Sequence, residues 1–558
     1  MRKSITFIAL LLAALFAFSA CGTPEPAEGE AARMFYTMHI EVPETPFLER
    51  NLRQDGTITV LDPDGEIVFE DVDAMVRGRG NSTWWHGPEK RPLRFRFAEA
   101  QSMFGSDYEA RDWILLANHF DQSLLRNYTA LHFASLLRFD FVPRPIHVHL
   151  YVNGEYMGVY TFTDERDVNP GRMELEWNPD PSLSSYFLEM DGRAPNDGVE
   201  NETFVFVNHI AYDLRWPDFP DELTPEHVEY IKAYLYAVSD AIRSENFEDI
   251  IQLIDLDTFV DFYIVQEFVK DPDAHITSVF MHIDGVGDER RLFMGPVWDY
   301  DLSIGNRGGQ ILGHGPEDLY VAVLHYWYRH LLQTPEFFDA VAARWNEIEG
   351  TILRETIDHV RDIATTYEAA FNRNFERHAQ AGSAVQFVPP EILEIYDFID
   401  HVEHMLGWLE ARAQWMSDFF NGRLPDYDPM WALVEYYTNV SPILIIKDGE
   451  YQEFEIAPII MNDRTQMALP EIARLIDATL SEDPATGLIT ITKGANTITH
   501  QPGETVMYVN GVRSELPMTS HMIIRGDAWL PLYRVVRSMG YEIDWHETLE
   551  RTLVMTSP

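Results

Sequence analysis

Apolar and polar residues alternate along the first part of the chain, which is typical of strands that bury one face. Residues 36–42 follow this pattern, and so do residues 146–152 and 156–160. The last two runs flank Asn153 and Gly154, a pair that favours a tight hairpin because both residues accept positive φ. Between these strands, residues 123–137 have helical spacing, with Ser123 as the expected N-cap.

The pattern becomes helical from about residue 224. Helices are predicted over residues 225–243 and 257–270, the second capped by Asp257, and long helical patterns cover residues 336–380 and 390–420. Residues 280–315 lie among these helices and are rich in Gly and Asp. Strands followed by helices predict an α+β domain over about residues 35–425. This span is large for one core and therefore indicates two packed lobes.

The pattern changes again after about residue 435. Residues 442–447 and 489–492 are strand-like, and a weak internal repeat follows. Residues 459–463 with Leu469 and Pro470 return as residues 522–527 with Leu530 and Pro531, each before a helical stretch. We expect two halves of one small α+β module over residues 435–558.

Composition and charge exclude several classes of function. The 558 residues include 42 Lys and Arg against 90 Asp and Glu, a net charge of −48, which argues against a nucleic-acid partner. The single Cys excludes a disulfide framework and Cys-rich zinc or iron–sulfur sites.

That cysteine, Cys21, follows a basic start and an apolar run over residues 5–18. This layout predicts a lipoprotein signal peptide over residues 1–21, lipid on Cys21 and a tether over residues 22–34. We therefore expect an extracytoplasmic protein that contacts the bacterial membrane through its lipid anchor only. The alternative, a membrane-spanning anchor, is disfavoured because the apolar run is short.

Basic residues concentrate between positions 77 and 97. Gly78 and Gly80 permit close approach of backbone N–H groups, Asn81 adds a donor, and arginines pair well with phosphate oxygens. The segment predicts a phosphate-binding site. The alternative is a Gly turn between two strands whose arginines pair with surface acids. Six basic residues fall in this segment: Arg77, Arg79, Lys90, Arg91, Arg94 and Arg96.

Acidic residues gather in two later loops, residues 270–275 and 295–306. Asp299, Asp301 and Asn306 offer hard oxygen ligands, which suit Mg²⁺ or Mn²⁺ and, with the metal, phosphates. The alternative is that the aspartates only cap turns. Together with the basic segment, these loops predict a nucleotide–metal site.

Six stretches, in this order, resemble the CotH (spore coat protein H) kinase-like family of atypical secreted kinases: residues 77–84, 113–118 with 125–128, 150–160, 186–191, 267–273 and 295–306. The resemblance implies a two-lobed kinase-like fold and ATP- and metal-dependent phosphorylation of protein Ser or Thr hydroxyls. By position, Asp273 matches the catalytic-loop Asp and Asp299 the metal-binding Asp, while Asp301 and Asn306 fall in the same motif.

Two positions depart from this family. Members often have Lys where this chain has Arg96 and Glu where it has Asp164. Arg and Lys differ in shape and in hydrogen-bonding geometry, so a change of phosphate contact is expected. Lys90 is the candidate substitute, and with Arg77, Gly78, Arg79, Gly80, Asn81 and Arg96 it completes the predicted nucleotide-binding set.

The C-terminal repeat resembles the domain named for the N-terminal part of copper amine oxidases. His500, His521 and His546 lie far apart with no ligand spacing, so a binding or spacing module is expected rather than copper chemistry. The leading hypothesis is a lipid-anchored kinase that uses ATP and Mg²⁺ or Mn²⁺ and acts on an envelope or coat protein. The rival hypothesis is a non-catalytic surface protein that keeps the kinase-like fold for binding.

Overall fold

The computed structural model describes residues 34–558, except residues 46–48, 88, 193–203, 209, 218–222, 309–314, 379–386, 440–441, 462–463, 503, 505, 517–521, 525–526, 547–548 and 550. The predicted signal peptide, Cys21 and all but the last residue of the predicted tether lie outside the described residues. The described part contains both helices and sheets, as the predicted α+β class requires.

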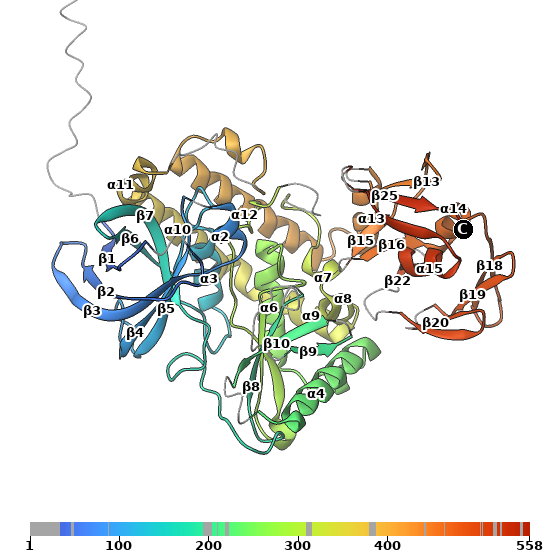
Figure 1. Cartoon of the computed structure of the whole chain (residues 1–558), viewed down its shortest axis with the longest axis horizontal. Coiled ribbons are helices and arrows are strands. Elements are labelled where there is room, and N and C mark those ends of the chain that lie inside the picture. The colour runs from blue at the N-terminus through green and yellow to red at the C-terminus, as the bar shows by residue number, and fades with distance from the viewer. Residues whose placement is uncertain are drawn as a thin grey trace, which may run out of the picture.

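The first region is a closed barrel of seven strands in the order β1-β2-β3-β4-β5-β7-β6 (Figure 1). The barrel closes where β1 pairs in parallel with β6. Alternate residues of each strand point inward, and Met38, Val60 and Phe95 are fully buried there. The strands are β1 Tyr36–Glu41, β2 Gln54–Leu61, β3 Ile67–Gly78, β4 Leu93–Gln101, β5 Ala110–Leu116, β6 Ile146–Val152 and β7 Glu155–Asp164.

Two short helices accompany the barrel, α2 Ser82–His86 and α3 Arg126–Ser135. The predicted Asn-Gly hairpin joins β6 to β7, with φ of 49° at Asn153 and 76° at Gly154. The predicted N-cap of the helix is wrong. Leu125 occupies that position, because the Ser123 hydroxyl instead donates to Asp121 at 2.6 Å.

A second, five-stranded sheet follows in the order β12-β11-β8-β10-β9. Helix α6 lies in the same core cluster as β8 and β11 and is buried along almost its whole length. Asp255, not the predicted Asp257, caps this helix by accepting a hydrogen bond from Thr258 N at 2.8 Å. The elements are β8 Tyr186–Met190, β9 Phe204–Val207, β10 Ile210–Trp216, α4 Pro225–Ser244, α5 Phe247–Ile250, α6 Leu256–Val269, β11 Val279–Asp284, η2 Gly287–Glu289 and β12 Arg291–Met294.

The long helical pattern predicted over residues 336–380 is divided into several elements. A π-helical turn, η3 Glu349–Leu353, separates α9 from α10, and a break at Tyr367 separates α10 from α11. The predicted helix over residues 390–420 begins only at Phe398. The elements are α7 Val321–Leu324, α8 Tyr326–Leu331, α9 Pro335–Ile348, α10 Arg354–Thr366, α11 Glu368–Asn372, η4 Arg373–Glu376, η5 Ile392–Glu394 and α12 Phe398–Phe420.

A C-terminal module follows α13 Pro429–Asn439 and lies far from the barrel (Figure 1). The predicted repeat forms two hairpins with a helix after each, and the hairpins pair through β16 and β23. The first unit is β15 Ile459–Met461, β16 Arg464–Ala468 and α14 Leu469–Leu475, and the second is β22 Met522–Ile524, β23 Asp527–Pro531 and α15 Leu532–Ser538.

Two further sheets complete this module, in the orders β14-β13-β25-β24 and β17-β18-β19-β20-β21. Their strands are β13 Leu444–Lys447, β14 Glu450–Gln452, β17 Thr479–Glu482, β18 Ile489–Lys493, β19 Asn496–His500, β20 Val506–Val509, β21 Val512–Glu515, β24 Glu542–Trp545 and β25 Thr552–Thr556.

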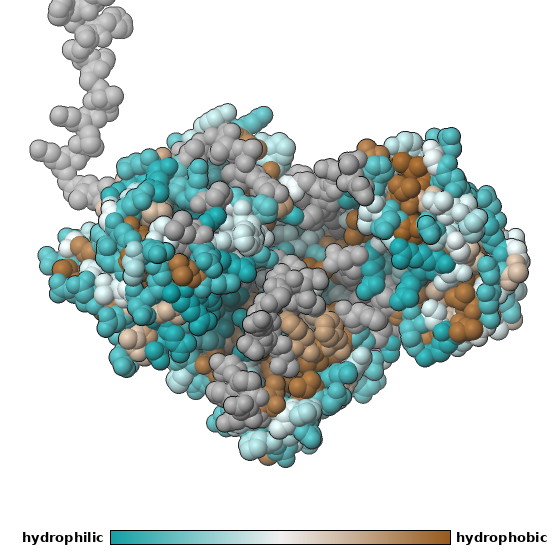
Figure 2. Space-filling view, in the orientation of Figure 1, coloured by the Kyte–Doolittle hydropathy of each residue, from teal (hydrophilic) through white to brown (hydrophobic). Residues whose placement is uncertain are grey.

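The surface follows the acidic composition. Figure 2 shows a face that is mostly hydrophilic over the barrel, with apolar patches on the C-terminal module. Among the helices of the described residues, none is both long enough and apolar enough to cross a membrane.

Candidate functional site

A cavity of about 600 Å³ brings together the basic and acidic segments that the sequence singles out. Arg77, Arg79, Gly80 and Asn81 reach it from the end of β3 and the loop that follows. Asp273, Asp299 and Asp301 reach it from the loops after α6 and β12. We call the basic side the arginine wall, formed by Arg77, Arg79, Arg94, Glu165 and Arg166, and the acidic side the aspartate wall, formed by Asp271, Asp273, Asp299 and Asp301.

Arg79 on the arginine wall faces Asp299 on the aspartate wall. Burial lowers the pKa of Arg79, and electrostatic attraction to Asp299 opposes that shift. The guanidinium carbon of Arg79 lies 5.4 Å from the centre of the Trp298 ring. The following residue, Gly80, has φ of +83°, and a Cβ there would come within 3.0 Å of Pro92. Glycine is therefore needed at the turn that directs this loop into the cavity.

Glu165 holds the arginines of its wall in place. Its carboxylate contacts Arg94 at 3.1 Å and Arg166 at 3.4 Å. Burial alone would raise the pKa of Glu165, but the neighbouring guanidinium groups of Arg94 and Arg166 hold the pKa well below its ordinary value. The arginine wall is thus preorganised by a buried, ionised carboxylate.

The aspartate wall concentrates negative charge. Burial, together with repulsion from neighbouring carboxylates, raises the pKa values of Asp271 and Asp301 well above their usual range. Asp299 adopts φ of +71°, an uncommon conformation for a residue other than glycine. Strained backbone of this kind is concentrated at functional sites. The wall has the properties of a site that is completed by a cation.

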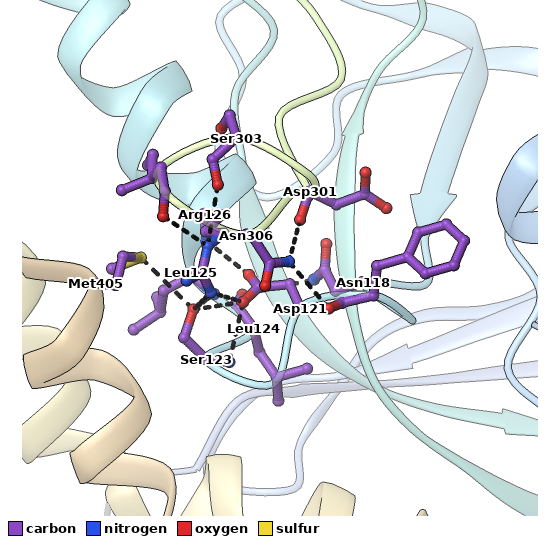
Figure 3. Close-up of polar contacts among 12 residues, drawn as sticks. Asn118, Asp121, Ser123, Leu124, Leu125, Arg126, Asp301, Ser303, Asn306 and Met405 are labelled. Carbon is purple, nitrogen blue, oxygen red and sulfur yellow. Dashed lines mark hydrogen bonds and ion pairs between the residues drawn. The ribbon is translucent and has the colours of Figure 1, made fainter. Parts of the chain in front are cut away.

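A buried hydrogen-bond network fixes the loop that carries Asp299 and Asp301 (Figure 3). Asp121 and Arg126 form an ion pair at 2.6 Å, and Arg126 Nε donates to the carbonyl oxygen of Ser303 at 3.2 Å. The amide of Asn306 donates to the carbonyl oxygens of Asp301 at 2.6 Å and Phe120 at 3.0 Å. The start of α3 and the residues before it therefore support the loop that carries Asp299 and Asp301.

Four predicted site residues do not line this cavity. Gly78 packs under Trp84, where a Cβ would lie 2.2 Å from the indole ring. Asn306 is buried behind the loop and binds its carbonyls, as described above. Arg96 pairs with Asp112 at 3.0 Å, and 47% of its side chain is exposed. It shares this carboxylate with Arg94, which does line the cavity.

Lys90 enters a different, small cavity of about 80 Å³. Its ammonium group donates to Asn374 Oδ1 at 2.8 Å, and burial lowers the pKa of Lys90 to about 7. It does not line the larger cavity with Arg79.

Sequence reasoning missed several charged residues that line the cavity. Glu165 and Arg166 end the strand pattern of the Asn-Gly hairpin, and this run of charge directly after buried residues was the available signal. Asp271 lies two positions before Asp273 in a stretch that the sequence did single out. The other missed residues are Arg50, Glu189, Asp191 and Arg215.

The aspartate wall fits a magnesium or manganese ion bound together with phosphates. Within the described ranges, no group of three or more His, Cys, Asp or Glu side chains is arranged to hold a metal ion by itself. Mg²⁺ is usually bound by one or two carboxylates, with phosphates and water as the other ligands. Asp299 and Asp301 can supply those carboxylates, and the raised pKa of Asp301 indicates an uncompensated site.

Residues 76–416 match the family model described as CotH kinase protein, more than half of the 558-residue chain. The chain belongs to the CotH kinase protein family. The CotH match covers the 77–81 loop and both acidic loops, so most of the residues that line the cavity lie within it. Residues 446–554 match the Copper amine oxidase N-terminal domain model. Both expected resemblances are confirmed, and a comparison with curated proteins found no match.

Proposed function

We propose that this CotH-family protein is an atypical kinase that transfers the γ-phosphate of ATP to Ser or Thr hydroxyls of an envelope or coat protein. Its catalytic region is taken to be two-lobed and kinase-like, with the barrel as one lobe. The observation that carries the proposal is the meeting of Arg79 and Asp299 in one cavity. Opposite charges on facing walls suit a triphosphate and its metal ion, since the phosphates need cations and the metal needs carboxylates.

The residues divide the work by charge. Arg77, Arg79 and Asn81 bind phosphate oxygens, and Asp299 and Asp301 hold Mg²⁺ or Mn²⁺. The metal supplies positive charge that offsets the charge on the phosphates. Asp273 orients the acceptor hydroxyl and takes its proton as the oxygen bonds to the γ-phosphorus and the bond to the leaving ADP oxygen breaks.

Alanine substitutions on the aspartate wall test this proposal. Asp273→Ala is expected to lower the rate of phosphate transfer by about 10²–10⁴-fold, the usual contribution of a positioned base. Asp299→Ala is expected to remove metal-dependent transfer. Asp339→Ala is the matched control, since Asp339 is exposed on α9. Transfer from labelled ATP to a protein acceptor is measured, and wild-type rates in both cavity variants would refute these roles.

A non-catalytic binding role is the second candidate. The described residues that line the cavity include arginines and no lysine. This lack of a lysine favours the binding role. Calorimetry with ATP and Mg²⁺ separates the two candidates. ATP binding followed by a labelled product supports the kinase, whereas absent binding favours the surface-protein role.

Export and lipid anchoring at Cys21 form a further part of the proposal. The support is the basic start, apolar run and small residues before Cys21. Cys21→Ala is expected to prevent incorporation of labelled fatty acid and to release the protein from the membrane fraction. Unchanged labelling would refute the anchor.

A further inference from the structure

A second charged cluster is buried outside the cavity, and its two charged side chains do not line it. Glu267 on α6 and Arg412 on α12 form an ion pair at 2.7 Å, and both side chains are 0% exposed. Burying two charges is costly unless further hydrogen bonds satisfy them. The partners of these two side chains therefore show what the cluster holds.

Those partners belong to one segment, residues 315–322, which leads into the first turn of α7 and which we call the clamped segment. Glu267 accepts hydrogen bonds from the backbone N–H groups of Tyr320 at 2.7 Å and Ala322 at 2.9 Å. Arg412 donates to the carbonyl oxygens of Pro316 at 2.9 Å and Asp318 at 2.7 Å. The ion pair thus supplies hydrogen bonds to the irregular backbone before α7 and to the first turn of that helix, where N–H groups lack a partner within the helix.

The clamped segment is in turn joined to the loop that carries Asp273. Lys270, the C-cap of α6, donates to the carbonyl oxygens of Gly315, at 3.0 Å, and Glu317. The hydroxyl of Tyr320 donates to the carbonyl oxygen of Pro272 at 3.1 Å. Pro272 and Asp273 both line the cavity. A displacement of the clamped segment would therefore move the residue next to Asp273.

We propose that Arg412 is a positioning residue for phosphate transfer, acting through Glu267 and the clamped segment to fix Asp273 in the cavity. This inference rests on the proposed kinase function. Arg412 does not line the cavity, so its loss affects the placement of Asp273 and leaves the arginine wall unchanged. The expected signature is a lower kcat with unchanged ATP affinity, because small misplacements of a reacting group reduce rate strongly.

Three variants test the proposal at increasing severity. Tyr320→Phe removes only the hydroxyl that contacts Pro272. Arg412→Lys keeps the charge but loses the planar fork, and Glu267→Gln/Arg412→Met removes both buried charges together, so neither is left unpaired. Arg361→Met is the matched control, since Arg361 makes exposed ion pairs with Glu403 and Glu410.

Each variant is measured for kcat, for ATP affinity by calorimetry in the presence of Mg²⁺, and for amide hydrogen exchange. We expect kcat to fall about ten-fold for Tyr320→Phe and about 10²-fold for the other two, with ATP affinity within about two-fold of wild type. Exchange is expected to accelerate at residues 271–274 and 315–322, whereas the control leaves all three measurements unchanged.

The outcomes separate this inference from the kinase proposal. A wild-type protein that neither binds ATP nor transfers phosphate overturns the kinase proposal. In that case amide hydrogen exchange at residues 271–274, compared between the variants and wild type, still tests whether Arg412 positions this loop. Unchanged exchange at those residues in the Arg412 variants overturns the inference. An active wild type whose three variants keep kcat also overturns it.

Discussion

The arginine wall and the aspartate wall lie across one cavity, but their charges are balanced in different ways. On the arginine wall, Arg94 has two carboxylate partners, Asp112 at 2.9 Å and Glu165 at 3.1 Å. On the aspartate wall, no ion pair is formed by Asp271 or Asp301 with any described residue, and the pKa values of both are raised. Carboxylates thus hold part of the arginine wall in place, whereas the aspartate wall accumulates charge of one sign.

This difference indicates the order in which the site is completed. Arginines that are already held by carboxylates are rigid before any ligand arrives, so they can bind phosphates without reorganisation. An unbalanced wall is destabilising by itself and becomes favourable when a cation binds. We therefore propose that the barrel side is preorganised for phosphate and that the opposite side depends on a metal ion, and each part of this proposal can be tested by a single substitution.

The largest effect is expected for Glu165→Gln, which removes the central anion of the arginine wall. Loss of one partner from a buried charge cluster leaves the other charges uncompensated, and we expect the free energy of unfolding to fall by about 3–5 kcal/mol. Denaturant unfolding measures the change. Glu155→Gln is the control, since Glu155 makes an exposed pair with Arg377 at 2.6 Å and should change stability by less than about 1 kcal/mol. Equal effects of the two variants would show that the wall is not balanced by Glu165.

The second effect separates Arg79, in the loop after β3, from Arg96 on β4. Arg79→Met is expected to weaken ATP binding by about 10–100-fold, because it removes charge-assisted hydrogen bonds to phosphate. Arg96→Met is expected to stay within about two-fold of wild type, since Arg96 pairs with Asp112 outside the cavity. Calorimetry with ATP and Mg²⁺ makes the comparison. Similar losses of ATP affinity in both variants would contradict a phosphate-binding role for Arg79 that Arg96 does not share.

Arg94 and Arg96, two residues apart on β4, show how far the sequence could predict the site. The alternation in β4 correctly puts Arg94 and Arg96 on the face opposite the buried Phe95. Only Arg94 lines the cavity, because Arg96 lies two residues further along the strand, about 6.7 Å away. The two-residue alternation of apolar and polar positions identifies a face of a strand, but it does not show where along the strand a cavity lies.

The remaining differences also come from contacts that are distant in sequence. The sequence located three strands of the barrel closely, β1, β6 and β7, from their alternating pattern, as in β1 Tyr36–Glu41. It did not predict the break at η3 Glu349–Leu353, because a π turn keeps nearly the same apolar spacing as a helix. Lys90 was assigned to phosphate by its charge, but its partner Asn374 lies 284 residues away.

The third effect concerns the aspartate wall. Asp301→Asn removes a buried, uncompensated charge with little change in shape, so we expect it to raise the free energy of unfolding by about 1–2 kcal/mol without metal. It is also expected to reduce the stabilisation by Mg²⁺ in thermal unfolding. Asp339→Asn is the exposed control. A destabilised Asp301→Asn protein would mean that the charge is already compensated.

The stabilisation by Asp301→Asn should depend on pH. The pKa of Asp301 is raised in the folded protein above the unfolded value of about 3.9. Between these two values the folded state binds more protons than the unfolded state, so the stability of the wild type falls as pH rises. The advantage of the variant over wild type should therefore grow from pH 4 towards pH 8. A constant difference would show that Asp301 does not titrate in this range.

The smallest effect is expected for Lys90→Met, which tests whether the arginine wall ends at the cavity. ATP affinity should stay within about two-fold of wild type, because Lys90 lines the separate cavity near Asn374. Its pKa of about 7 in the folded protein lies below the unfolded value of about 10.4, so the unfolded state binds the extra proton between these values. Wild-type stability should then rise by about 1 kcal/mol from pH 7 to pH 8, and this increment should be missing in the variant. A marked loss of ATP affinity would instead place Lys90 with the phosphate-binding residues, and the two walls would no longer account for all the charge that the ligand meets.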